Sequence, residues 1–219
     1  YQNRLIFVLN RNKIFFNYIK QFKFNFNLNN LAKFFFKVKI PTQNKNVTFS
    51  LNNKFDLDCN QLEKKLIYEK KFFSSKNLDW LNWKYNKYLK KNHLFIVKIF
   101  DNKNLVGFIV LIQNYEKTYK LKRLSITEIV IIKEKMFILN YVLNYCINLG
   151  KKNNFDVIDA VGFQKEKRVI FEKIGFIKKK SANYNFLIKN NKKELENTLF
   201  NNSEELDLSL TDGDGVLNL

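Results

Sequence analysis

Strand-like and helix-like runs alternate between residues 94 and 180, and their order is the feature that most constrains the fold. Two β-rich runs, "HLFIVKIF" and "LVGFIVLI", are joined by the polar residues 101–104, which is typical of an antiparallel hairpin. A strand at residues 121–132, a helix at 133–150 and a strand at 155–161 follow. Neighbouring strands that are joined through a helix run parallel, so the sequence predicts a mixed sheet.

The segment "VIFEKIGFIKKK", residues 169–180, predicts a corner between a helix and a strand. Gly175 can adopt the left-handed backbone conformation that closes a helix, and Phe176 can then fold back onto the last turn. We therefore expect a helix that ends at Gly175 and a short strand directly after it. Two later runs, "YNFLIKN" and "LDLSL", are expected to form closing strands.

Two helices are expected ahead of the hairpin. In "DCNQLEKKLIYEKKFF" and "NLDWLNWKYNKYLKK" apolar residues recur close to helical spacing, and Asn77 can cap the second helix. The side chains expected on the apolar faces are Leu62, Leu66, Ile67 and Phe73 in the first segment and Leu81, Tyr85, Tyr88 and Leu89 in the second.

The run "KEKMFILNYVLNYCINLG" is the most regular helical segment of the chain. Asn140, Asn144 and Asn148 recur every four residues and form one polar stripe on an otherwise apolar helix. Gly150 is expected to end this helix. A helix with a single polar stripe is buried on most sides, so we expect it against the sheet.

The formal net charge of +19 by itself favours contact with nucleic acid or an anionic membrane surface. However, the only arginines are Arg4, Arg11, Arg123 and Arg168, whereas bidentate phosphate recognition favours arginine over lysine. A solvated lysine surface is therefore the preferred interpretation, and no specific nucleic-acid partner is expected.

Cysteine usage and hydropathy favour a cytoplasmic protein. Cys59 and Cys146 lie far apart and flank no histidine, so neither a disulfide framework nor a metal site is expected. The longest uncharged run, residues 136–150, is shorter than the roughly 18 apolar residues of a membrane span. We therefore expect no transmembrane helix.

Residues 1–45 differ from the rest of the chain because they interleave Phe, Ile and Leu with Lys and Asn. We interpret them as a basic, aromatic-rich connecting arm that precedes a globular domain at residues 46–219. An alternative is that the arm lies on an anionic membrane surface. Since the chain begins with Tyr1 and its only methionine is Met136, we expect a segment upstream of Tyr1.

From Asp56 onward the order of elements resembles that of the GNAT superfamily of acyl-CoA-dependent acyltransferases. "FEKIGF" is similar to the Tyr-Glu-Lys-Leu-Gly-Phe signature that ends a helix in this family, and "WLNWKY", "VGFIVL" and "LTDGDG" resemble a bacterial two-lobed subgroup. The resemblance implies an α+β fold with a mixed, mostly antiparallel sheet and helices on both faces. It also implies that residues 1–45 are the tail of a further, N-terminal GNAT-like lobe.

The resemblance places a binding site between the ends of two neighbouring parallel strands, where the pantetheine arm of acetyl-CoA or another acyl-CoA binds. Val130 and Ile132, at the end of the first of these strands, are the residues expected to contact the arm. Lys133 and Lys135 stand where the family has a glycine-rich phosphate loop, and they can pair with phosphate as point charges. No metal is implied.

Acyl transfer to an amine needs a base for the ammonium proton and an acid for the leaving thiolate. Glu128 matches the strand position that often carries the family's base, although a solvated glutamate at the sheet edge is an equal alternative. The family's tyrosine acid corresponds to Phe171, which has no hydroxyl and is better explained by core packing. Tyr184 and Tyr145 are candidate substitutes.

Trp80, Trp83 and Tyr85 are candidates for binding the acceptor, because sugar rings stack on aromatic side chains. At helical spacing the same residues can instead belong to the core. The subgroup implies an amino sugar of a surface polysaccharide as the small-molecule acceptor. Two alternatives remain: a GNAT-like lobe that has lost catalysis and acts as a binding or scaffold domain, and a basic module that binds nucleic acid or membrane surfaces.

Overall fold

The computed structural model describes residues 3–9, 46–69, 72–117, 120–161, 165–180 and 206–207 of the chain. Its strands are β1 (Asn3–Val8), β2 (Val47–Asn52), β3 (Phe72–Phe73), β4 (Leu94–Asp101), β5 (Asn104–Glu116), β6 (Leu121–Ile131), β7 (Val157–Val161), β8 (Ile177–Lys180) and β9 (Leu206–Asp207). Its helices are α3 (Asp58–Glu69), α4 (Leu78–Lys90), the 3-10 helix η1 (Lys133–Ile138), α5 (Leu139–Lys152) and α6 (Lys165–Ile174).

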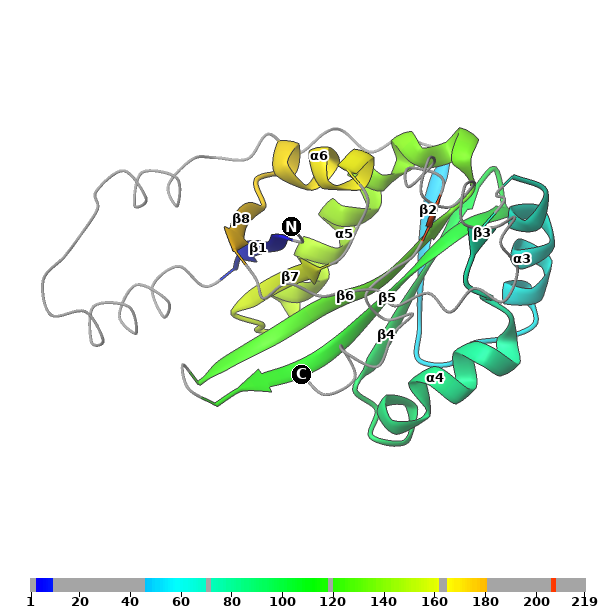
Figure 1. The fold of residues 1–219 in the computed structure, drawn as a ribbon. Coiled ribbons are helices and arrows are strands. Elements are labelled where there is room, and N and C mark those ends of the chain that lie inside the picture. The colour runs from blue at the N-terminus through cyan, green and yellow to red at the C-terminus, as the bar shows by residue number, and fades with distance from the viewer. Residues whose placement is uncertain are drawn as a thin grey trace, which may run out of the picture.

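The main sheet has seven strands in the order β2-β4-β5-β6-β7-β1-β8, and β3 and β9 form a separate two-stranded sheet (Figure 1). In the main sheet β6 and β7 run parallel, and the other neighbouring strands run antiparallel. The connection from β6 to β7 passes through η1 and α5, and a helical crossover of this kind brings strands together in parallel. The expected mixed, mostly antiparallel sheet is therefore confirmed.

Helices cover both faces of the main sheet (Figure 1). One hydrophobic cluster packs α3 and α4 against the sheet and includes Leu62, Leu81 and Ile96. The other cluster packs α5 and α6 against the opposite face and includes Leu143 and Val97. Each large apolar side chain that is fully buried contributes roughly 1.5–3 kcal/mol to folding, so the two clusters are the main source of stability. The α+β class with helices on both faces is confirmed.

α4 begins at its predicted cap. The side-chain oxygen of Asn77 accepts a hydrogen bond from the backbone N–H of Trp80 at 2.9 Å. This satisfies one of the donors that a helix leaves unpaired in its first turn and contributes about 1 kcal/mol. Leu81, Tyr85 and Tyr88 are buried, so the predicted apolar face is confirmed there.

α3 differs from its prediction at two residues. Leu62 and Leu66 are buried as expected, but Ile67 is 55% exposed. One residue turns a helix by about 100°, so Ile67 leaves the face that Leu66 buries. Phe73 lies outside the helix, because α3 ends at Glu69 and Phe73 belongs to β3.

The hairpin of β4 and β5 is tighter than predicted. Asp101 and Asn104 pair with each other, so the turn consists of Asn102 and Lys103 alone. Both turn residues have a positive φ, 48° and 67°, as a two-residue type I′ turn requires.

The long helical segment is divided into η1 and α5, and Gly150 does not end it. α5 continues to Lys152, with Asn153 as its C-cap. A Cβ atom on Gly150 would lie 2.7 Å from Leu9 Cδ1 and 3.1 Å from Ile158 Cδ1. The glycine therefore allows close packing of the helix on the sheet, and the prediction of a glycine stop is wrong.

β1 lies between β7 and β8 and pairs with both. Residues 3–8, which were assigned to the connecting arm, thus belong to the sheet of the globular domain. Residues 10–45 lie outside the described part, and for them the arm stays a prediction. The position of β1 in the sheet is set by its pairing with β7 and β8, which lie far from it in sequence. The sequence of residues 3–8 does not by itself indicate these partners.

The helix-to-strand corner has the predicted form. Gly175 has a φ of 104°, and the N–H of Phe176 donates to the carbonyl of Phe171 at 3.0 Å. The Phe176 ring then lies 4.7 Å from the Phe171 ring, edge to face. Of the two closing strands, "YNFLIKN" lies outside the described residues, and "LDLSL" contributes β9, which pairs with β3.

Candidate functional site

The parallel strands β6 and β7 part after a short paired stretch. Their register runs from Arg123 opposite Val157 to Ile126 opposite Ala160. β6 continues from there to Ile131, and among the described strands only β5 pairs with that part. A strand edge that no neighbouring strand pairs with can hydrogen-bond an extended ligand. The predicted divergence of two adjacent parallel strands is thus present in the fold.

A β-bulge lies where the two strands part. Val110 pairs with Glu128 and Leu111 pairs with Ile126, so Thr127 is the extra residue of β6. The hydroxyl of Thr127 donates to the carbonyl oxygen of Val110 at 3.3 Å. Because a bulge bends its strand and redirects side chains, it accounts both for the divergence and for the direction of Glu128 toward α4.

Glu128 lies in a buried ion-pair network. Its Oε1 accepts a hydrogen bond from Lys84 Nζ at 2.6 Å, and its Oε2 lies 3.1 Å from Lys76 Nζ. The Tyr85 hydroxyl donates to the same Oε1 at 3.3 Å. The side chain of Glu128 is 2% exposed and that of Lys84 1%, so water and salt screen these charges little. Glu128 is therefore not the solvated edge residue of the alternative interpretation.

Trp80 completes this cluster, which we call the Glu128 network: Lys76, Trp80, Lys84, Tyr85 and Glu128. The centroid of the Trp80 ring lies 4.0 Å from Lys84 Nζ and 4.7 Å from Lys76 Nζ. Both ammonium groups thus gain a cation–π contact, and such contacts strengthen when they are shielded from water. α4 carries Trp80, Lys84 and Tyr85 along one side, where helical neighbours three and four residues apart meet.

The structure separates the three predicted acceptor-binding residues. Trp80 and Tyr85 lie beside Glu128, whereas Trp83 is 75% exposed on another side of α4. Sequence reasoning missed Lys76 and Lys84. The spacing of Lys84 could have indicated its burial. It follows Trp80 by one helical turn and directly precedes Tyr85, on a helix with an apolar face.

The residues predicted to hold acyl-CoA take up different environments. The Val130 side chain packs in the α3/α4 cluster, and Ile132 contacts both clusters. Lys133 is exposed at the start of η1, while Lys135 Nζ lies 2.7 Å from Asp101 Oδ2 at the end of β4. The 3-10 helix η1 begins two residues after the end of β6, at the point where the resemblance implies a glycine-rich loop.

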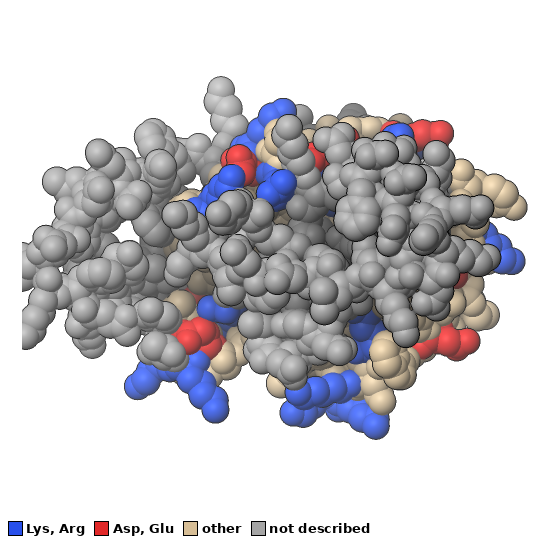
Figure 2. Space-filling view, in the orientation of Figure 1, with Lys and Arg blue, Asp and Glu red and all other residues tan. Residues whose placement is uncertain are grey.

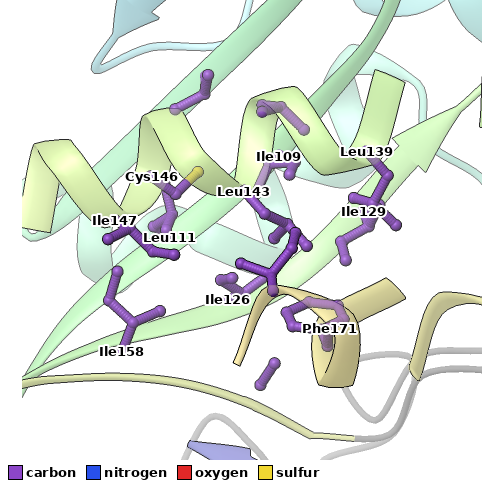
Figure 3. Close-up of a cluster of buried hydrophobic side chains, with 14 of the residues drawn as sticks. Ile109, Leu111, Ile126, Ile129, Leu139, Leu143, Cys146, Ile147, Ile158 and Phe171 are labelled. Atoms are coloured by element: carbon purple, nitrogen blue, oxygen red, sulfur yellow. The ribbon is translucent and has the colours of Figure 1, made fainter. Parts of the chain in front are cut away.

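Phe171 is fully buried, and Figure 3 shows it among aliphatic side chains of β6 and α5. The core-packing interpretation of Phe171 is confirmed. One turn earlier on α6, Lys167 is also buried, and its Nζ donates to the backbone carbonyl of Ile129 at 3.4 Å. Ile129 lies beyond the stretch of β6 that pairs with β7. Sequence reasoning missed Lys167, and its helical spacing to Phe171 was the one signal for its burial.

A second polar group joins β6 and β7 within their paired stretch. Ser125 Oγ donates to Asp159 Oδ1 at 2.6 Å, and Asn114 Nδ2 donates to Ser125 Oγ at 3.3 Å. Arg123 Nε lies 3.7 Å from the other oxygen of Asp159. Asp159 is 1% exposed, so these bonds offset the cost of burying its charge.

Neither cysteine is suited to nucleophilic chemistry. Burial raises the pKa of the Cys59 thiol and, more strongly, that of the Cys146 thiol. A thiol with a raised pKa carries little of the reactive thiolate at neutral pH. Within the described ranges, no group of His, Cys, Asp and Glu side chains is placed to hold a metal ion.

The described charged side chains do not form one stripe on the face that Figure 2 shows. There the described Lys and Arg side chains lie in separate groups near the rim, with acidic side chains among them. No helix in the described part of the chain combines the length and apolar character that crossing a membrane requires.

The strand order of the main sheet, its one parallel pair among the described strands and the divergence of that pair are those that the GNAT resemblance implies, so the fold is GNAT-like. Among solved structures, the chain is similar to a predicted acetyltransferase from Clostridium acetobutylicum, solved with acetyl-CoA, at 18% identity and a TM-score of 0.47, covering 65% of this chain and 96% of that one. It is also similar to a GNAT family acetyltransferase from Staphylococcus aureus, at 14% identity and a TM-score of 0.49, covering 65% and 99%.

A third similar structure is glucosamine-6-phosphate N-acetyltransferase from Arabidopsis thaliana, at 13% identity and a TM-score of 0.45, covering 65% of this chain and 99% of that one. At these identities and TM-scores, neither an activity nor a substrate of this chain follows from its neighbours. No protein-family model matches the sequence, and no curated protein matches it.

Proposed function

We propose that this chain is an acyl-CoA-dependent acyltransferase that acts on a primary amine. The observation that carries the proposal is the edge of β6 beyond Ile126, where β7 has parted from the strand. A pantetheine arm is extended and contains two amide groups, so it can hydrogen-bond to such an edge as a strand does. Lys133, exposed on η1, is near enough in sequence to that edge to meet the phosphates.

The Glu128 network supports an amine as the acceptor. One buried carboxylate holds the ammonium groups of Lys84 and Lys76, and the longer of the two contacts is that of Lys76, at 3.1 Å. A substrate ammonium has the same chemistry as the Lys76 head group and can replace it on Oε2. Glu128 then serves as the base that takes the proton before the amine attacks the thioester.

An amino sugar of a surface polysaccharide is the acceptor that we favour. Trp80 presents an aromatic ring beside the Glu128 carboxylate, and sugar rings pack on such faces. Trp83, which is 75% exposed, is not required by this proposal. We place the reaction in the cytoplasm, where acyl-CoA is available, and regard an upstream GNAT-like lobe in the same polypeptide as a further proposal.

A second candidate function is a GNAT-like lobe that binds its ligand without catalysis. It is favoured by the saturation of Glu128 with two lysines and by Phe171, which has no proton to donate. In this case an acyl-CoA can still occupy the edge of β6, but no acyl group is transferred.

Calorimetry with acetyl-CoA, followed by an acetyl-transfer assay on glucosamine and related amino sugars, tests both candidates. We expect binding that weakens about fivefold in Lys133→Ala, because an exposed charge pair with a phosphate contributes about 1 kcal/mol. Lys151→Ala, an exposed lysine at the far end of α5, is the control and should bind as the parent chain does.

The outcomes separate the candidates. Binding together with acetyl transfer supports the enzyme, and binding without transfer to any primary amine supports the second candidate. No heat with acetyl-CoA, together with no transfer, rules out both functions for this lobe.

A further inference from the structure

Lys167 is a buried lysine to which the site described above gives no role. It belongs to α6 and is 3% exposed. Lysine is seldom buried so completely, because desolvating an ammonium group is costly unless its surroundings favour the charge. What matters for function is therefore where this group lies in the fold.

The ammonium group of Lys167 lies at the free edge of β6. Its bond to the Ile129 carbonyl joins α6 to a part of β6 where pairing with β7 has ended. The distance of 3.4 Å exceeds the usual range of roughly 2.7–3.2 Å, so a small movement of the side chain is enough to bring Nζ to another acceptor. Under the proposed function, this edge is where the thioester lies.

Phe171 follows Lys167 by one helical turn, so the two side chains leave α6 on the same face. The resemblance puts a tyrosine acid at the position of Phe171, and the phenylalanine ring is fully buried in the core instead. The one described residue on this face of α6 with a proton to give, and with its donor atom at the edge of β6, is Lys167.

We propose that the ammonium group of Lys167 protonates the sulfur atom that leaves when the thioester is cleaved. The inference rests on the proposed acyltransfer function and adds a catalytic residue to it. An ammonium group there has a proton to give and places a positive charge beside the sulfur as negative charge develops on it.

The lone pair of the acceptor nitrogen forms the new C–N bond, and the C–S bond breaks with its electron pair going to sulfur. Lys167 Nζ transfers one proton to that sulfur, so coenzyme A leaves as the thiol. The neutral amine of Lys167 regains a proton from water, and the proton of the acceptor ammonium passes to Glu128.

Lys167→Met and Lys167→Arg in the full chain test the assignment, with Lys173→Met as the control. Lys173 is an exposed lysine on the same helix. We expect Lys167→Met to lower kcat with acetyl-CoA about a hundredfold or more, the effect of removing a general acid, and Lys173→Met to leave it unchanged. Lys167→Arg should be as slow as Lys167→Met, because a guanidinium keeps the charge but does not release its proton.

Binding supplies a readout that does not depend on turnover. Calorimetry compares coenzyme A with desulfo-coenzyme A, which lacks the sulfur atom. We expect the parent chain and Lys167→Arg to bind coenzyme A several-fold more tightly than the desulfo analogue, because both retain a cation beside the sulfur. Lys167→Met should bind the two analogues equally.

A parental kcat in Lys167→Arg, or an unchanged preference for coenzyme A in Lys167→Met, overturns the inference while the proposed function stands. If Lys167→Met does not fold, the Arg variant decides by its kcat. If the parent chain itself neither binds acetyl-CoA nor transfers an acetyl group, the proposed function fails and this inference fails with it.

Discussion

The Glu128 network predicts that a single buried lysine on α4 supports much of the stability of the α3/α4 layer. Lys84→Met keeps the length of the side chain but removes its ammonium group. Glu128 Oε1 then loses the shortest contact of the network, 2.6 Å, and retains the Tyr85 hydroxyl at 3.3 Å. Lys76 remains on Oε2 at 3.1 Å, so the carboxylate keeps one cationic partner.

The expected cost follows from burial. The side chains of Lys84 and Glu128 are 1% and 2% exposed, and breaking a pair that is buried to this degree costs roughly 3–5 kcal/mol. Because Lys76 still pairs with Glu128, we expect the lower end, about 3 kcal/mol. A domain of this size is stabilised by roughly 5–15 kcal/mol in total, so the variant should fold but unfold at a much lower denaturant concentration.

Urea unfolding followed by circular dichroism measures this loss. With a slope of about 2 kcal/mol per molar urea, a loss of about 3 kcal/mol lowers the midpoint by about 1.5 M. The control is Lys87→Met, the same change on an exposed residue of α4, which should cost no more than about 0.5 kcal/mol. The combined variant Lys76→Met/Lys84→Met/Glu128→Leu should recover at least half of the loss, since all three charges of the network are then removed together.

If Lys84→Met costs no more than Lys87→Met, the ammonium group is not held in a dry environment, and the electrostatic argument for the Glu128 network is refuted. A loss of about 3 kcal/mol that persists in full in the combined variant would instead show that the cation–π contact of the Lys84 ammonium group with Trp80 is responsible.

Two further predictions concern the sheet. Gly107→Ala should cost roughly 1–3 kcal/mol, because its Cβ would lie 2.4 Å from the backbone carbonyl of Val130, which cannot move without β6. Gly150→Ala is the matched variant and should cost less, because the three atoms nearest to its Cβ belong to the side chains of Leu9 and Ile158 and not to the backbone; equal losses in urea unfolding would contradict this. Burial lowers the pKa of Lys98, but hydrogen bonds to Asp56 and Asp58 outweigh it and raise the pKa overall.

Since the folded pKa of Lys98 lies above the unfolded value of about 10.4, its contribution to stability is fully present below that pH and is lost as the pH rises through the folded pKa. Urea unfolding between about pH 9 and 11.5 should show this alkaline decline, and Lys98→Met should reduce its slope. An unchanged slope in the variant would show that other groups cause the decline.

Local patterns predicted much of the fold. Gly175 ends α6 because few residues other than glycine adopt its positive φ readily, and Asn77 caps α4 because its short side chain reaches the first-turn amides. Both are short-range effects that a sequence window contains. Gly150 shows the limit of such arguments, since its role depends on Leu9 and Ile158, which lie far from it in sequence.

The candidate site was predicted less completely. Glu128 was recognised as a candidate because the resemblance places a base at its position on the strand. Its partners were not, because Lys76 and Lys84 are two among many lysines, and only the packing of α4 on β6 selects them. Lys167 was missed for the same reason.

The sequence by itself therefore determined the type and order of the elements between residues 94 and 180 and the mixed character of the sheet, because hydrophobic period, turn residues and connection lengths act over short distances along the chain. The tertiary structure decided which strand lies between β7 and β8, where β6 and β7 part, and which charges are buried. These features depend on contacts between residues far apart in sequence. In such contacts a lysine, which the sequence alone would assign to the surface, is buried against a carboxylate or a strand edge.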